Sequence, residues 1–414
     1  MNREQFLKDI WQAYPAAPRG GAWRFGRFER QGREFVLKRY DGEEKFPLPD
    51  EVEIQALRAP VVVAAFWGAL RSGDWVAYRP PAEEKAAVSL LAPRLCEPTF
   101  ANALTATTRA FSDYRADLRA FFRGRGFEEI ATPTLVDCPG TEVFLDVFKT
   151  EFAPGTARRR DFYLPTSPEL HLKKALALGG ERIFELRPCF RNGEITEKHR
   201  PEFWMLEWYR AFANLDDLKS DCRDLVRHVT GLNDLQFTEI SIRELFSQLE
   251  IDLTPQTSAD ELKTWCRRLG LQADHYELWD DLFYLIFVDR IEPFLPSAQP
   301  LFVVDYPPSQ AALARVNERG WADRFELYWR GYEIANAYFE LNDPVEQRRR
   351  SEEDLRKRVA LGRQELKLDE GFLEALESGM PPSAGIALGA ERLFMAARGV
   401  KDIGDLSPYQ IIRD

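Results

Sequence analysis

At its most informative point the chain reads Phe190-Arg191-Asn192-Gly193-Glu194 and, a few residues later, His199-Arg200-Pro201-Glu202-Phe203-Trp204-Met205-Leu206-Glu207-Trp208-Tyr209. If residues 203–209 form a strand, the two-residue period of side chains places an apolar ring, a carboxylate and a phenol on one face. The residues on that face are Phe203, Met205, Glu207 and Tyr209. The combination predicts a hairpin that holds a purine and an amine together, although each half alone is equally typical of an ordinary strand and surface loop.

The composition limits the class of protein. The chain has 414 residues and a formal net charge of −11, from 56 Lys and Arg against 67 Asp and Glu, which argues against a surface covered by nucleic acid. The longest uncharged apolar stretch, residues 61–70, is too short to span a bilayer, and the polar N-terminus has no signal-peptide pattern. The five cysteines form no CxxC pair and the four histidines no HExxH motif, so neither disulfides nor a zinc site is predicted. We expect a cytoplasmic protein that does not enter a membrane.

The chain changes character near residue 95. Residues 1–95 contain short β-leaning runs between Gly, Asp and Pro turns, which predict a small β-rich module, with a barrel as one form of it. From residue 100, helical spacing and apolar strands alternate, which indicates an α+β body with a large sheet over residues 100–414. Its first predicted helix carries Phe111, Tyr114, Leu118 and Phe121, ends at Gly126 and precedes a strand at 127–130. Further helices are predicted at 168–177, 215–229, 258–269, 277–288 and 344–363, and strands at 182–186, 201–209, 301–306 and 324–341.

Three more segments can complete a binding site. The first is Thr166-Ser167-Pro168-Glu169, where a proline begins a helix and a carboxylate lies in its first turn. These residues can serve helix capping alone. In the functional interpretation, Glu169 holds an ammonium group.

The second segment, residues 325–340, predicts a hairpin that turns near Arg330-Gly331. Glu326 and Glu333 lie about equally far from that turn, so their carboxylates can approach each other across the strands. Two unpaired carboxylates repel, and Mg²⁺ accepts a few carboxylate ligands together with water and phosphate oxygens. The pair therefore predicts a nucleotide–metal site, with a solvent-exposed acidic edge as the alternative.

The same segment places Asn336, Tyr338 and Glu340 on one face of its second strand. An amide beside a carboxylate suits an amino-acid ligand. Asn336 would meet the carboxylate end of the ligand, and Glu340 would meet a cationic side chain.

In the third segment, residues 383–393, a run of small residues precedes an amphipathic helix. Glycines such as Gly389 allow close backbone approach, a helix start favours an anion, and Arg392 lies in the first turn. The pattern predicts a phosphate clamp, although glycine turns before helices are common. No Walker A sequence and no GxGxxG fingerprint occur, so the predicted nucleotide site belongs to another class.

Together these segments resemble a known family. Residues 121–133, 187–210 and 385–395 resemble motifs 1, 2 and 3 of the class II aminoacyl-tRNA synthetases, over roughly residues 100–410. The segments around residues 167–169, 191–209 and 333–340 are similar to the lysine branch of that class. The likeness is greatest to truncated lysyl-tRNA synthetase paralogues that ligate (R)-β-lysine to elongation factor P. It rests on residues 166–169, residues 307–311 and Ala387. At the position of Ala387, tRNA-charging relatives usually have glycine. The resemblance implies a class II antiparallel sheet flanked by helices, with an OB-like N-terminal module.

The resemblance also implies a role for each candidate residue. Arg191 and Arg392 would be the catalytic pair that binds the α- and γ-phosphates, and Mg²⁺ would be held by Glu326 and Glu333. The implied ATP-binding residues are Arg191, Asn192, Glu194, His199, Phe203, Gly389 and Arg392. The implied residues for lysine or (R)-β-lysine are Ser167, Glu169, Glu207, Tyr209, Asn336, Tyr338, Glu340 and Ala387.

Three functions stay open at this point. The first is activation of lysine or (R)-β-lysine as an acyl-adenylate and its transfer to a lysine of elongation factor P. The second is charging of lysine tRNA, which the extra residues 1–95 favour and Ala387 disfavours. The third is a protein that binds lysine or nucleotide and makes no product. The resemblance further implies a homodimer through motif 1. The chain departs from the family pattern at Gly193, where family members usually have a glutamate that contacts the adenine.

Overall fold

The computed structural model describes residues 24–31, 34–39, 42–47, 53–54, 70, 74–79, 87–92, 106–153, 155, 159–407 and 409. The chain divides into two compact units, residues 1–106 with 408–414 and residues 107–407. The predicted boundary at residues 95–100 and the apolar stretch at 61–69 lie outside the described residues.

The first unit contains a six-stranded sheet in the order β3-β2-β1-β5-β6-β4. All neighbouring strands are antiparallel except β4 and β6, which are parallel. The buried ring of Phe35 packs edge-on against Tyr78, with 4.9 Å between centroids. The predicted β-rich module is confirmed, and its OB-like form stays a prediction. The strands are β1 (Arg24–Gln31), β2 (Glu34–Arg39), β3 (Gly42–Pro47), β4 (Glu53–Ile54), β5 (Trp75–Arg79) and β6 (Ala87–Ala92).

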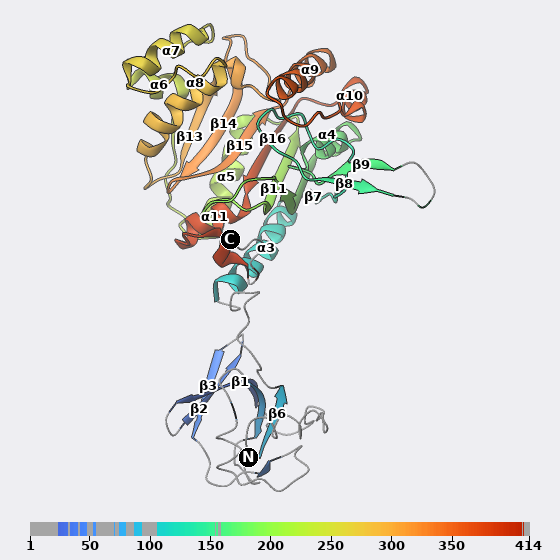
Figure 1. Cartoon of the computed structure of the whole chain (residues 1–414), viewed down its shortest axis with the longest axis vertical. Coiled ribbons are helices and arrows are strands. Elements are labelled where there is room, and N and C mark those ends of the chain that lie inside the picture. Colours follow the sequence, from blue (N-terminus) through green and yellow to red (C-terminus); the bar gives the residue numbers. More distant parts are fainter. Residues whose placement is uncertain are drawn as a thin grey trace. The chain divides into compact units, whose positions relative to one another are not determined.

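The second unit is built on an eight-stranded sheet in the order β12-β13-β14-β15-β16-β11-β10-β7 (Figure 1). Its central strands are antiparallel, as predicted, whereas the edge pairs β12–β13 and β7–β10 are parallel. Parallel neighbours need a long crossover, and helices separate both of these pairs in the chain. The strands are β7 (Glu128–Glu129), β10 (Arg182–Phe190), β11 (Glu202–Ala211), β12 (Thr238–Ser241), β13 (Leu301–Tyr306), β14 (Ala322–Trp329), β15 (Tyr332–Phe339) and β16 (Ser383–Gly389), and a separate hairpin consists of β8 (Lys149–Phe152) and β9 (Arg160–Tyr163).

Helices cover this sheet, and their ends follow local sequence signals. Capping boxes begin α5 at Asn214 and α7 at Ser258, and Gly231 ends α5 with a φ of 70°. No helix among the described residues is both long and apolar enough to cross a bilayer. The helices are α3 (Ala106–Gly124), α4 (Glu169–Ala177), α5 (Leu215–Thr230), α6 (Ile242–Ser247), α7 (Ala259–Arg268), α8 (Trp279–Ile286), η1 (Phe287–Ile291), η2 (Glu292–Phe294), η3 (Pro308–Gln310), α9 (Pro344–Ala360), α10 (Glu370–Glu377), α11 (Ala390–Arg398) and η4 (Ile403–Leu406).

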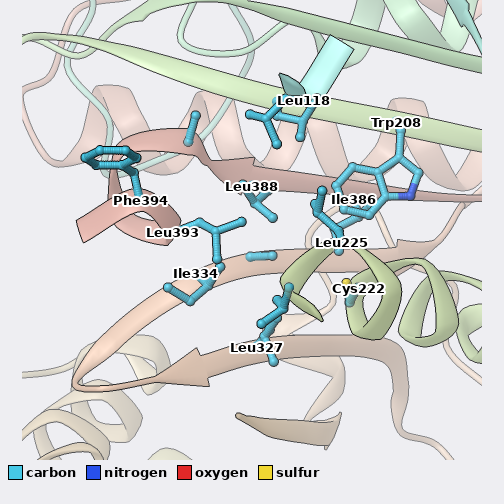
Figure 2. Packing of buried hydrophobic residues seen from close by; sticks show 14 of the residues in the cluster. Leu118, Trp208, Cys222, Leu225, Leu327, Ile334, Ile386, Leu388, Leu393 and Phe394 are labelled. Carbon is cyan, nitrogen blue, oxygen red and sulfur yellow. The ribbon is translucent and has the colours of Figure 1, made fainter. Parts of the chain in front are cut away.

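The central strands alternate between a buried apolar face and a polar face. The apolar face packs against α3, α5 and α11, as Figure 2 shows for Leu118, Trp208, Leu225, Leu327, Ile386, Leu388 and Leu393. The small residues 383–389 form the central strand β16, because Ala384, Ile386 and Leu388 alternate into this core. The intervening residues of the same strands face the opposite side of the sheet, where the candidate residues lie. The expected α+β fold with a large sheet is confirmed.

Candidate functional site

The strand register brings candidate residues into rows on the polar face of the sheet. Glu207 on β11 lies opposite Ala387 on β16. Ala387 in turn lies opposite Asn336 on β15, which lies opposite Glu326 on β14. The next row consists of Tyr209, Gly385, Tyr338 and Arg324. These rows line a pocket of about 620 Å³, a volume typical of sites for small-molecule ligands.

A β-bulge turns Glu333 toward the same pocket. Leu327 pairs with Ala335, whereas the next residue of β14 pairs with Glu333, so Ile334 is the extra residue. Under simple alternation, the odd spacing between Glu333 and Asn336 would place them on opposite faces. The bulge places both in the lining of the pocket. The sequence predicted the turn of this hairpin but gave no signal for the bulge.

The pocket unites nearly the whole candidate set. All predicted site residues line it except Asn192 and Glu340. Asn192 lies in the loop between β10 and β11, where its backbone N–H donates to the carbonyl of Asp146 at 2.9 Å. Glu340 is buried, with 1% of its surface exposed. Glu340 therefore acts on the pocket through its neighbours rather than from the pocket surface.

A buried lysine joins two of the candidate carboxylates. Lys173 Nζ lies 2.7 Å from Glu169 Oε1 and 2.6 Å from Glu340 Oε2. Glu169 and Lys173 are one turn apart on α4, so both project from the same side of the helix. The fully buried ammonium depends on these partners, because an unpaired buried charge is strongly destabilising. The sequence analysis missed Lys173, for which this spacing was the available signal.

Glu207 adds a third carboxylate with a free oxygen. Tyr209 Oη donates to Glu207 Oε2 at 2.9 Å, whereas Glu207 Oε1 is buried without a hydrogen-bond partner among the described residues. Burial, together with the nearby charge of Glu169, raises the pKa of Glu207 well above its usual range. Burial likewise raises the pKa of Glu340 to about 8. Glu169, Glu207 and Glu340 thus share the charge of one ammonium group, and a further bound cation would favour their ionised forms.

Arg392 and His199 form the opposite end of the candidate set. Arg392 Nη2 donates to His199 Nε2 at 2.6 Å, which leaves the proton of the neutral ring on Nδ1, 2.8 Å from Thr196 Oγ1. Burial lowers the pKa of His199, and the charge of Arg392 lowers it further. Arg392 also donates to the backbone carbonyl of Glu333 at 3.0 Å. The sequence analysis did not find Glu391, whose carboxylate accepts from the backbone N–H of Trp204 at 2.7 Å and ties α11 to β11.

Within the described structure, Arg191 has a hydrogen-bond donor without a partner and lies beside the ring of Phe203. Its guanidinium lies 5.1 Å from the centroid of Phe203, and its Nε is buried without a partner among the residues that the structure describes. An arginine with free donors suits an anion such as phosphate, and the ring offers a flat surface to a base. Gly193 adopts a φ of +84°, a conformation that disfavours a residue with a side chain, while the neighbouring Glu194 lines the pocket.

The two predicted metal ligands, Glu326 and Glu333, keep acceptor positions that a cation could use. Glu326 accepts from Tyr306 and Tyr328, each at 2.6 Å, and from Arg324, which leaves its carboxylate one acceptor position. Glu333 has 38% of its side chain exposed, and its pKa is raised by burial and then by the charge of Glu326. No cluster of three or more metal-binding side chains occurs in the described part of the chain. Water and phosphate oxygens would therefore supply the remaining ligands.

Comparison with known proteins establishes the family. A family model described as tRNA synthetases class II (D, K and N) matches residues 98–412. The chain belongs to this family. The family match confirms the class II assignment made from the sequence motifs.

The curated relatives are similar over the same part of the chain. The "Elongation factor P--(R)-beta-lysine ligase" of Proteus mirabilis (strain HI4320) is 39% identical over 305 residues, which cover 72% of this chain and 93% of that protein. Proteins of the same name from Hamiltonella defensa and Erwinia tasmaniensis are 36% and 40% identical, over 73% and 72% of this chain and 94% and 93% of their own lengths. The class II family and these ligases identify the chain as a ligase.

Proposed function

We propose that this ligase activates lysine or (R)-β-lysine with ATP and transfers the acyl group to a lysine of elongation factor P. The observation that carries the proposal is the composition of a single pocket, in which buried carboxyl groups accompany Arg191, whose buried Nε has no partner among the described residues. The acceptor and the β-amino acid are supported by the name that these relatives carry.

The carboxylate cluster suits a ligand with two amino groups. Glu169, Glu207 and Glu340 carry three potential negative charges against one from Lys173, which leaves two unmatched. A diamino acid such as lysine supplies two ammonium groups and removes the cost of burying these charges. Asn336, in the same row as Glu207, would then meet the carboxylate of the ligand.

The first step needs positioning rather than a general base. The carboxylate of the amino acid is ionised near pH 7, so its oxygen can attack the α-phosphorus of ATP directly. The P–O bond to pyrophosphate breaks, and pyrophosphate leaves with the bonding electrons. Arg191 and Arg392 stabilise the charge that develops on the phosphates. Mg²⁺ held by Glu326 and Glu333 would neutralise further charge on the phosphate oxygens.

Pyrophosphate exchange with and without lysine or (R)-β-lysine tests this step. Wild-type protein is expected to exchange label only when one of these amino acids is present. Arg191→Ala should lower the exchange rate about a hundredfold, since loss of one such charge contact costs about 3 kcal/mol in the transition state. The exposed Arg398→Ala serves as the matched control and should exchange normally. Unchanged exchange in a folded Arg191→Ala protein would remove the basis of the proposal.

A further inference from the structure

The pocket has a second acidic part, formed by elements other than those that carry the three glutamates. We call it the α9 chamber. Three of its residues lie on one face of α9, at spacings of four and three residues, so their side chains point the same way. The chamber residues are Gln347, Ser351 and Asp354 of α9, Asp280 of α8 and Gln310 of η3, and all of them line the pocket.

The chamber contains one buried acceptor that has no donor within the described ranges, the Oε1 atom of Gln347. Gln347 has 1% of its surface exposed and donates from Nε2 to Ser351 Oγ at 3.1 Å. Its buried Oε1 has no partner among the described residues. A buried carbonyl oxygen without a donor is costly, and native structures seldom leave one unmatched. The oxygen therefore points to a ligand that donates a hydrogen bond.

The charge of the chamber specifies a cation. Burial raises the pKa of Asp354 to about 6, and the charges of Glu353 and Asp280 act in the same direction, against Lys357 and Arg350. Neither of these cations pairs with Asp354: Lys357 lies 3.3 Å from Glu353, and Arg350 donates to Glu346 and backbone carbonyls. A primary ammonium group has three N–H donors, which match the three acceptors offered by Asp280, Asp354 and Gln347.

Hydrogen bonds link the chamber to the reacting end of the pocket. The side-chain Nε2 of Gln310 donates to Asp280 Oδ1. The backbone carbonyl of Gln310 accepts from Arg324 Nη1 at 2.6 Å. Arg324 Nε donates in turn to Asn336 Oδ1 at 3.1 Å. Asn336 is the residue that we place at the carboxylate of the amino acid, so the chain of hydrogen bonds ends where the activated acyl group forms.

The side of the pocket next to the chamber is open to solvent. Tyr284 of α8 and Val288 of η1 line the pocket and have 37% and 53% of their surfaces exposed. A chain that enters past these apolar side chains can place a long amine-bearing side chain in the chamber. A lysine of an acceptor protein has the required length and charge.

We infer that the α9 chamber binds the primary amine of the acceptor lysine and directs it at the acyl-adenylate. This inference rests on the proposed function. The bound ammonium gives one proton to an aspartate of the chamber. The neutral amine then leaves its acceptors in the chamber, and the free electron pair of its nitrogen forms a C–N bond with the acyl carbon. The C–O bond to AMP breaks, AMP leaves with the bonding electrons, and the second amine proton passes to solvent. The product is an amide.

The test compares two half-reactions in Asp354→Asn, which keeps the size of the side chain. Exchange of pyrophosphate does not need the acceptor and should match that of wild-type protein. Transfer of labelled (R)-β-lysine to elongation factor P should fall at least tenfold in kcat/KM for the acceptor. Asp280→Asn should behave in the same way and replaces Asp354→Asn if that variant does not fold. Glu352→Gln, at an exposed position of α9, is the control and should transfer normally.

The outcomes separate this inference from the proposed function. Transfer at the wild-type rate by folded Asp354→Asn and Asp280→Asn proteins overturns the inference alone. A parallel loss of exchange and transfer also overturns it, since the chamber would then serve the amino acid rather than the acceptor. Wild-type protein that exchanges pyrophosphate but labels tRNA instead of elongation factor P overturns the proposed function, and the inference with it.

Discussion

Lys173 is the residue on which the amino-acid end of the pocket most depends. Its ammonium is the only cation within ion-pair distance of Glu169 and Glu340 among the described residues. Burial alone would lower the pKa of Lys173, but the charges of the two glutamates outweigh burial and raise it. Lys173 therefore stays protonated at any pH at which the protein works and keeps both carboxylates in place before the ligand binds.

Replacement of this lysine should be costly. Lys173→Met removes the buried ammonium partner of Glu169 and Glu340, and the free energy of unfolding should fall by about 3–5 kcal/mol. Lys174→Met is the control, because that lysine pairs with Asp369 in a partly exposed position and should cost about 1 kcal/mol or less. Urea denaturation of both variants provides the comparison. Equal losses would show that the buried pair has no special role.

Gly385 provides the space that the two neighbouring side chains require. A Cβ atom at this position would lie 2.1 Å from Tyr209 Cε1 and 2.3 Å from Glu340 Oε1. Both neighbours are buried, so they cannot move aside freely. Gly385→Ala should cost about 1–3 kcal/mol through overpacking and raise the KM for lysine in pyrophosphate exchange. Gly124→Ala, where a Cβ meets nothing within 4 Å, is the control. A normal KM in Gly385→Ala would contradict the assignment of this row to the ligand.

At the scale of elements, the loop at residues 139–145 lines the pocket and depends on α9. Arg358 is buried, and its guanidinium donates to the backbone carbonyls of Glu142 and Leu145, the latter at 2.8 Å. Arg363 adds a bond to the carbonyl of Phe144 at 3.0 Å. Two arginines near the end of α9 therefore set the backbone of a loop that lies far away in the sequence.

Loss of this anchor should affect stability and binding together. Arg358→Met leaves backbone carbonyls without donors, so the free energy of unfolding should fall by about 3 kcal/mol and the KM for lysine should rise. Arg356→Met removes only a bond to the Glu352 carbonyl on the same helix and should cost less than about 0.5 kcal/mol. Denaturation and exchange kinetics test both variants. A stable Arg358→Met protein with a normal KM would exclude this role for the arginine.

The same elements show what the sequence could predict. The strand that carries Phe203 to Tyr209 was predictable because its alternation is local, and the turn at Arg330-Gly331 because Gly331 tolerates the positive φ of 78° that it adopts. The bulge at Ile334 was not predictable, since it depends on pairing between strands rather than on composition. Lys173 and Arg358 were missed for a related reason. The fold brings Glu340 to Lys173 and the carbonyl of Glu142 to Arg358 from far away in the sequence. Glu169, the other partner of Lys173, lies on the same helix, but charge patterns alone do not show that this face is buried.

At the scale of the whole molecule, binding of the amino acid should be coupled to pH. Burial raises the pKa of Glu340 to about 8 and that of Glu207 well above its usual range, so the free protein holds protons on these carboxyls near neutral pH. A dicationic ligand favours the ionised forms and releases these protons. Affinity for lysine should therefore rise as the pH increases toward about 8, the pKa of Glu340.

Calorimetry in buffers with different ionisation enthalpies measures this proton release. The free energy of unfolding of the ligand-free protein should follow the opposite trend, because the folded chain holds more protons on these carboxyls than the unfolded chain does. Their contribution is full below about pH 4.5 and is lost as the pH rises toward 8. An affinity that does not change with pH, with no proton release, would contradict the coupling.

The most direct measurement is transfer of labelled (R)-β-lysine and α-lysine, with ATP and Mg²⁺, to elongation factor P and to lysine tRNA in parallel reactions. The proposed function predicts ATP-dependent label on elongation factor P that withstands mild base, as an amide does, and none on tRNA. Label on tRNA alone, or binding of lysine without any transfer, would contradict it.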